Sequence, residues 1–81
     1  MIKEHDLVVL SRTAPEYGLE PGDVGTVVAR YPTGGYEVEF VSAAGDAVAV
    51  LTLTDSDVRP MRGAEILHVR GLAPLSSPER A

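Results

Sequence analysis

The sequence predicts an all-β fold: a small five-stranded barrel followed by a C-terminal extra strand or arm. Three observations indicate it. Short valine-rich segments alternate with turns that contain glycine and proline, residues suited to reversing the direction of a chain. Hydrophobic residues make up 44% of the 81 residues but aromatic residues only 5%, which leaves Val, Leu and Ala to form the core. Residues 36–41 alternate apolar and polar side chains, as a half-buried strand does.

A single domain of this length can hold five short strands, with a helical turn between the last two. The expected strands span residues 7–12, 24–31, 36–41, 47–53 and 58–61. Pro60 lacks a backbone N–H group and so confines the last strand to an edge or an end of the sheet. Residues 64–70 have the composition of a further strand outside this unit. We therefore expect a barrel over residues 1–62, a C-terminal strand or arm over 63–72 and a flexible tail over 73–81.

The clearest expected strand is residues 36–41. Alternation places Tyr36, Val38 and Phe40 on one face and Glu37 and Glu39 on the other. The apolar face is expected in the core. The two glutamates then point outward, where they form either an ordinary solvated face or an acidic patch for a basic partner.

Glycines are expected to shape the turns. Gly18, Gly22 and Gly25 join the first two strands, and Gly45 suits the left-handed position of a bulged hairpin turn. The Lys-Ser/Thr pair that completes a phosphate-binding loop is missing from the first of these segments, which also contains two acidic residues. We interpret all four glycines as structural.

The first and fourth expected strands carry apolar residues on both faces, which a lone barrel with one interior does not accommodate. Val8, Leu10, Val48 and Val50, or else their alternates, would face solvent unless another segment covered them. We expect residues 64–72 to cover this outer face, either within one chain or by exchange between two subunits of a homo-oligomer.

Charge is distributed unevenly along the chain. Residues 1–58 contain three basic and ten acidic side chains, a net charge of −7, whereas the last 23 residues contain four basic and two acidic ones, a net charge of +2. An acidic body repels polyphosphates, because nucleic-acid affinity comes largely from Lys and Arg. The basic segment can instead pack against the acidic body, in the same subunit or in a neighbour.

The chain has no cysteine, which excludes disulfides, thiolate catalysis and cysteine-ligated metals. Its first residues are partly acidic, and no apolar run of the length of a signal peptide or a membrane span follows them. We expect a cytoplasmic protein with no membrane partner.

No motif indicates catalysis. His5 and His68 are the only imidazoles and lack an accompanying nucleophile motif, so we interpret them as surface or capping residues. Asp55 and Asp57 offer too few oxygen ligands for a calcium loop and are expected to cap a turn. We therefore expect no enzyme, no catalytic residues, no metal and no cofactor.

Tyr17 and Tyr31 lie near expected loops and are candidates for stacking on a peptide or a base, whereas Tyr36 is expected in the core. Together with the outer face and the arm, they give a set of candidate interaction residues: Val8, Leu10, Tyr17, Tyr31, Glu37, Glu39, Val48, Val50, Ile66 and His68.

The segment Gly22-Asp23-Val24-Gly25-Thr26-Val27 resembles the Gly-x-x-Gly-x-Val core that opens the second strand of SH3-like barrels of the KOW kind. With residues 2–4, 18–19, 36–40, 52–53, 57–60 and 65–70, the chain looks like a family of small uncharacterised bacterial proteins. The resemblance covers residues 1 to about 70. It implies an SH3-like barrel and no assigned activity. KOW modules that bind nucleic acid tend to be basic, and this chain is acidic.

Our leading hypothesis is a non-enzymatic protein–protein interaction module that binds another protein, or itself, through the outer sheet face and the C-terminal arm. One version is an antitoxin, immunity or accessory protein that masks a basic partner. The alternative is a nucleic-acid-binding KOW-like barrel that uses Arg12, Arg30, Arg59, Arg62 and Arg70.

Overall fold

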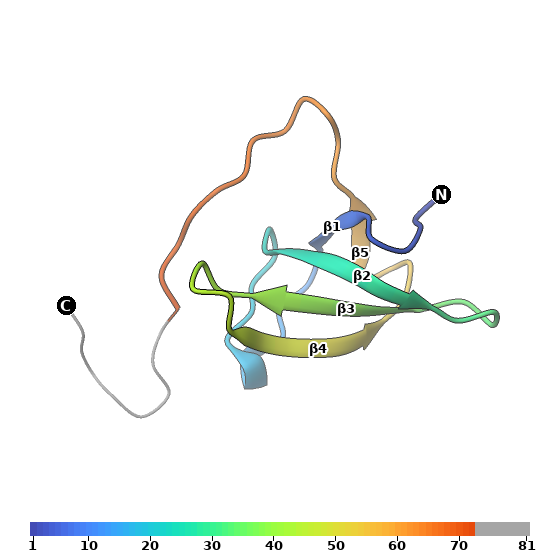
Figure 1. Ribbon diagram of the computed structural model, residues 1–81, viewed down its shortest axis with the longest axis horizontal. Coiled ribbons are helices and arrows are strands. Elements are labelled where there is room, and N and C mark those ends of the chain that lie inside the picture. Colours follow the sequence, from blue (N-terminus) through green and yellow to red (C-terminus); the bar gives the residue numbers. More distant parts are fainter. Residues whose placement is uncertain (73–81) are drawn as a thin grey trace.

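The computed structural model describes residues 1–72 and confirms the all-β prediction. Its elements are β1 (Leu7–Leu10), the 3-10 helix η1 (Pro15–Tyr17), β2 (Val24–Arg30), β3 (Tyr36–Val41), β4 (Ala47–Leu53) and β5 (Val58–Pro60). The five strands form one antiparallel sheet in the order β4-β3-β2-β1-β5. Figure 1 shows β2, β3 and β4 side by side, with β5 running across their direction. The observed strands differ from the expected ones by at most two residues at their ends.

The core takes side chains from every strand. Its largest fully buried side chains are Val8, Leu10, Val27, Val38 and Leu53. Tyr36 is also buried, as its place in the alternation predicted. Removing these apolar groups from water is the main source of stability in so small a domain. The core therefore fixes the two ends of the sheet against each other and positions the loops that join them.

The expectation that Val8 and Leu10 lie on an exposed outer face is wrong. Both point into the core, and they are among the most deeply buried residues of the chain. The opposite face of β1 carries Leu7, which is exposed, and Val9, which is buried between its cross-strand neighbours Val24 and Arg59. The apolar residues of β1 are thus accommodated without a second chain.

A bulge explains the two apolar faces of β4. The pairing of β3 with β4 shifts by one residue between Phe40 and Val41, which leaves Val48 as an extra residue that packs against the core. Alternation resumes after it and turns three further side chains inward: Ala49, Leu51 and Leu53. Of the two valines expected on the outer face, only Val50 remains there, where it is 48% exposed.

Gly25 does not lie in a turn, as the sequence had suggested, but within β2, opposite Val8. A Cβ atom at this position would lie 2.6 Å from Cγ1 of Val38 and 2.9 Å from a ring carbon of Phe40. Gly25 is therefore required for the close approach of β3 side chains. The other three glycines predicted to shape turns have positive φ angles, which favour glycine: 71° at Gly18, 98° at Gly22 and 90° at Gly45.

Residues 61–72, which we call the arm, follow β5 and form no strand, so the expected strand over residues 64–70 is wrong. No backbone hydrogen bond joins residues 66–72 to another backbone group in the described part of the chain. Strand propensity alone does not make a strand, because no neighbouring strand runs beside this segment. Figure 1 shows the arm (orange) arching away from β5 and returning toward the end of the β3–β4 hairpin. The expected tail at 73–81 lies outside the described residues.

Candidate interaction site

Two ion pairs attach the arm to the body of the domain, and the first lies near β5. The Arg59 guanidinium donates to both carboxylate oxygens of Glu65, at 2.9 and 2.6 Å. The same carboxylate accepts the backbone N–H of Arg62 at 2.7 Å. This contact closes a tight loop at the start of the arm and leaves the following residues to extend from it.

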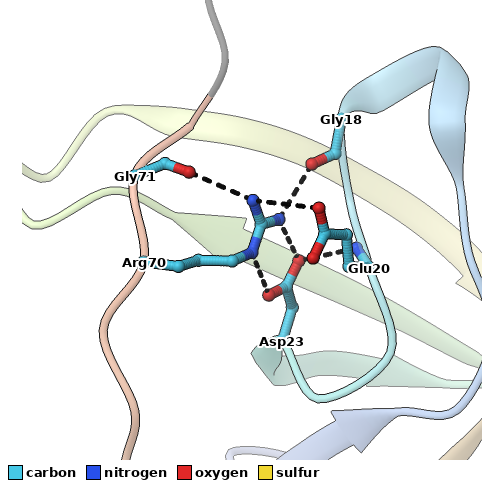
Figure 2. Close-up of polar contacts among 5 residues, drawn as sticks. All are labelled: Gly18, Glu20, Asp23, Arg70 and Gly71. Carbon is cyan, nitrogen blue, oxygen red and sulfur yellow. Dashed lines mark hydrogen bonds and ion pairs between the residues drawn. The ribbon is translucent and has the colours of Figure 1, made fainter.

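The second attachment is Arg70, at the far end of the arm (Figure 2). Its Nε and Nη2 atoms donate to the two carboxylate oxygens of Asp23, at 2.8 and 2.5 Å. Nη2 also donates to the Gly18 carbonyl at 2.9 Å, while Nη1 lies 3.7 Å from Glu20 and donates to the Gly71 carbonyl. The planar guanidinium thus meets a carboxylate with two parallel hydrogen bonds, the strongest geometry for this type of pair.

The residues that receive Arg70 belong to one short segment, residues 18–23, which we call the arginine corner. Gly18 caps the end of helix η1, and its left-handed backbone turns its carbonyl toward the arm. Asp23 accepts the backbone N–H of Glu20 at 2.8 Å, and the N–H of Gly22 donates to the Leu10 carbonyl at 2.8 Å. The corner is therefore held in place by β1 and by its own hydrogen bonds.

Each of these ion pairs shifts the pKa values of its members. Hydrogen bonding to Arg70 lowers the pKa of Asp23, although partial burial acts in the opposite direction. Bonding to Arg59 lowers the pKa of Glu65 to about 2. Both arginine pKa values rise. All four groups are therefore charged at neutral pH, and both attachments of the arm are intact.

These shifts predict that acid weakens the second attachment. A lowered pKa in the folded state gives stability that is complete above the ordinary carboxyl pKa of about 4 and is lost as the pH falls through the folded value. Between pH 7 and pH 3, Asp23→Asn should lose less stability than the wild type, by up to about 1 kcal/mol for a partly exposed pair. Urea unfolding at both pH values measures the difference. Equal losses in the two proteins would show that the Asp23 pair does not contribute.

A groove of 390 Å³ lies between the arm and the end of the β3–β4 hairpin. Val69 and Leu72 of the arm line one side of it. The apolar side chains of the body that line it are Leu19, Val24, Phe40, Val41 and Val48. The arm nevertheless leaves much of its own apolar surface in water, since Ile66 is 92% and Val69 89% exposed. We call Ile66, Leu67, Val69 and Leu72 the arm surface. Four large exposed apolar side chains on one short segment make it a candidate interaction site.

His68 lines the same groove as Asp23 and Ser42, which raises the question of catalysis. Both oxygens of Asp23 are bonded to Arg70, and no hydrogen bond joins His68 to either neighbour within the described residues. His5 lies elsewhere, with a positive φ and its N–H bonded to the Val27 carbonyl. Residues 1–72 hold no group of three metal-binding side chains and no buried polar side chain.

A second groove, of 640 Å³, lies between the β2–β3 turn and β5. Tyr31 and Tyr36 line it, but their hydroxyls are already used: Tyr31 donates to Glu37 at 2.9 Å, and Tyr36 donates to Asp55. These bonds to carboxylates raise both tyrosine pKa values. Glu37 also accepts the hydroxyl of Thr52 at 2.8 Å, so it takes part in cross-strand bonding on the outer face.

Comparison with known proteins bears on the body of the domain. Residues 4–60 match the model of a family described as Domain of unknown function (DUF4926). The chain belongs to this family. The resemblance to an uncharacterised family is thus confirmed, and the DUF4926 match includes all five strands and the arginine corner but ends before the arm. No curated protein and no solved structure is significantly similar to the chain.

Arginines of this DUF4926 protein offer little support for the nucleic-acid alternative. Three of the five candidates are bound to carboxylates: Arg12 to Asp57 at 2.9 Å, and Arg59 and Arg70 as described above. Asp57 also accepts the backbone N–H of Thr54 and so caps the turn before β5, as expected. These ion pairs neutralise the charge that a phosphate backbone would require.

The interaction residues predicted from the sequence thus do not form one site but lie on different elements. Tyr17, on η1, is exposed, and the pair Glu37 and Glu39 lies partly exposed on the outer face of β3. Ile66 and His68 lie exposed on the arm. The residues that sequence reasoning missed are those of the arginine corner. The opposite charges of the body and the C-terminal segment were the signal that could have found them.

No helix among residues 1–72 is long and apolar enough to cross a membrane.

Proposed function

We propose that this DUF4926 protein is a non-enzymatic protein–protein interaction module that binds its partner through the arm surface and the neighbouring outer sheet face. One observation carries the proposal. The arm exposes Ile66, Leu67 and Val69, and none of the backbone groups of residues 66–72 is paired with another backbone group in the described part of the chain.

An extended segment in this state is suited to pairing with the edge of a partner's sheet. Its N–H and C=O groups, which pair with no other backbone group in the described residues, can supply main-chain hydrogen bonds, and its exposed apolar side chains can supply specificity. Residues 66–72 can reach about 23 Å when fully extended, which is longer than a typical strand in a small sheet. The groove beside Val69 gives the partner an apolar surface on the body as well.

The strand order supports the finer part of the proposal, that the body is an SH3-like barrel of the KOW kind. In this order β2 links a β3–β4 half to a β1–β5 half, and Gly25 of β2 allows the side chains of Val38 and Phe40 in β3 to approach closely. The net charge of −5 supports a basic partner, as for a cytoplasmic bacterial antitoxin, immunity or accessory protein. A second copy of the chain is the competing partner.

The experiment compares three forms of the full chain as bait in extracts of the source cell. Ile66→Glu/Val69→Glu places two charges on the arm surface, and both side chains are exposed, so the fold should be unaffected. Val28→Glu is the matched control, because Val28 is an exposed apolar residue that lines neither groove. Wild type and the control should retain one common partner, and the double variant should lose at least about nine-tenths of it, since buried charge costs several kcal/mol. Equal recovery by all three would refute the proposal.

A further inference from the structure

We infer that the arginine corner is a receptor for an arginine of the partner protein, and that Arg70 is a built-in occupant that the partner displaces. This inference rests on the proposed function and specifies the chemistry of its partner. The partner would present an extended segment with an arginine beside apolar residues, as Val69-Arg70-Gly71-Leu72 does within the chain itself.

The first argument is the chemistry of the corner. Its acceptors face the guanidinium from several directions: both carboxylate oxygens of Asp23, the Gly18 carbonyl and, at longer range, the Glu20 carboxylate (Figure 2). This set fits the flat, forked donor array of arginine, whereas the ammonium group of lysine can satisfy only part of it. The corner is thus selective for arginine among basic residues.

The second argument is that the corner does not depend on the arm for its shape. Hydrogen bonds within the body hold Asp23 and Gly22, and the backbone of Leu19 pairs with Ala14 while its side chain is buried. Gly18 donates its N–H to the Pro15 carbonyl. If the arm leaves, these contacts remain, and the acceptors are ready for another guanidinium without reorganisation.

The arm between its two ion pairs is weakly held. Between the two ion pairs, Ile66 and Val69 stay exposed and the backbone has no partner within the described residues. The Arg70 and Asp23 side chains are themselves 26% and 17% exposed, and ion pairs in contact with water contribute little. An incoming arginine would remake the bonds that Arg70 gives up to Asp23 and Gly18, and displacing the arm also opens the 390 Å³ groove for the partner's apolar residues.

Charge selects a basic partner rather than a second copy. Two copies of a chain with net charge −5 repel each other, whereas a positively charged protein is attracted to the acidic body before docking. Its arginine would replace one that is already present, so the local charge of the corner is unchanged by the exchange. The partner can in addition contact the apolar side chains and the backbone groups of residues 66–72, which make few contacts with the body.

The test uses a capped peptide of residues 65–72 as the probe and titrates it into full-length variants by fluorescence anisotropy. Arg70→Gln empties the corner and should bind the peptide. A tethered arm acts at an effective concentration of about 1 mM, so for a peptide Kd of about 0.1 mM the wild type should bind about tenfold more weakly. Asp23→Asn/Arg70→Gln should lose binding, as should Arg70→Gln when the peptide carries lysine in place of its arginine.

Failure of Arg70→Gln to bind the peptide, or equal binding by Asp23→Asn/Arg70→Gln, would overturn the inference. If the Asp23 variant does not fold, Glu20→Gln/Arg70→Gln replaces it. This variant keeps the bond from the Glu20 N–H to Asp23 and should show a smaller loss of peptide affinity. Sedimentation of the wild type alone tests the occupant, because an arm exchanged between copies would make the wild type a dimer, and that result would overturn the basic partner. Peptide binding combined with unchanged capture by Ile66→Glu/Val69→Glu would refute the proposed function and leave the receptor standing.

Discussion

Replacing Leu53 with alanine is expected to lower the free energy of unfolding by about 3–4 kcal/mol. Leu53 is completely buried at the end of β4, so the substitution removes apolar contacts and leaves a cavity. For a domain of this size, such a loss corresponds to a fall in Tm of roughly 15–25 °C. Val50→Ala, in the same strand but half exposed, is the matched control and should cost less than about 1 kcal/mol. Similar effects of the two substitutions, measured by urea and thermal unfolding, would contradict the assigned core.

Gly25→Ala is expected to destabilise the domain by about 2–3 kcal/mol, although alanine normally suits a strand better than glycine does. The added methyl group would lie well inside contact distance of the Val38 and Phe40 side chains and 3.1 Å from the Glu39 carbonyl. The packed core gives it little room to move away.

Two further substitutions distinguish this clash from a general effect of removing glycine. Gly63→Ala should be close to neutral, because nothing lies within 4 Å of the new Cβ and no positive φ is recorded there. Val38→Ala should partly relieve the clash, so Gly25→Ala/Val38→Ala should be more stable than the sum of the single losses predicts. A strictly additive double mutant would indicate that Gly25 is needed for another reason.

Local pattern was sufficient to predict the five strands of the sheet, although it also predicted a strand over residues 64–70 that does not form, and it did not predict the register between strands. Alternation over residues 36–41 identified β3 and its inward face, and Tyr36, Val38 and Phe40 are buried as expected. The bulge at Val48 could not be predicted, because a register shift depends on how two strands pair rather than on either sequence alone. Without the bulge, the sequence predicted that residues 64–72, from the same chain or from a second one, must cover the apolar residues of β4.

The candidate site was harder to predict than the fold. Asp23 appeared to be a turn residue and Arg70 a member of a strand, and 47 positions separate them. Their contact depends on the path of the arm, which no local propensity determines. What the sequence did indicate was an acidic body followed by a basic segment, and the structure shows where these opposite charges meet.

The family match adds a constraint to this picture. It covers residues 4–60, so Gly18, Glu20 and Asp23 lie within the matched region whereas Arg70 lies after it. The receptor thus belongs to the family domain, and its occupant comes from the segment that follows. This division is what we expect if the corner serves a partner and the arm only fills it when the partner is absent.

We propose above all that the arm surface binds a protein partner. The measurement that tests it most directly is the amount of that partner retained by the Ile66→Glu/Val69→Glu chain relative to the Val28→Glu chain. We predict that at most about a tenth remains on the arm variant while the control matches the wild type. Equal retention by the two variants, with both shown to be folded, would contradict the account.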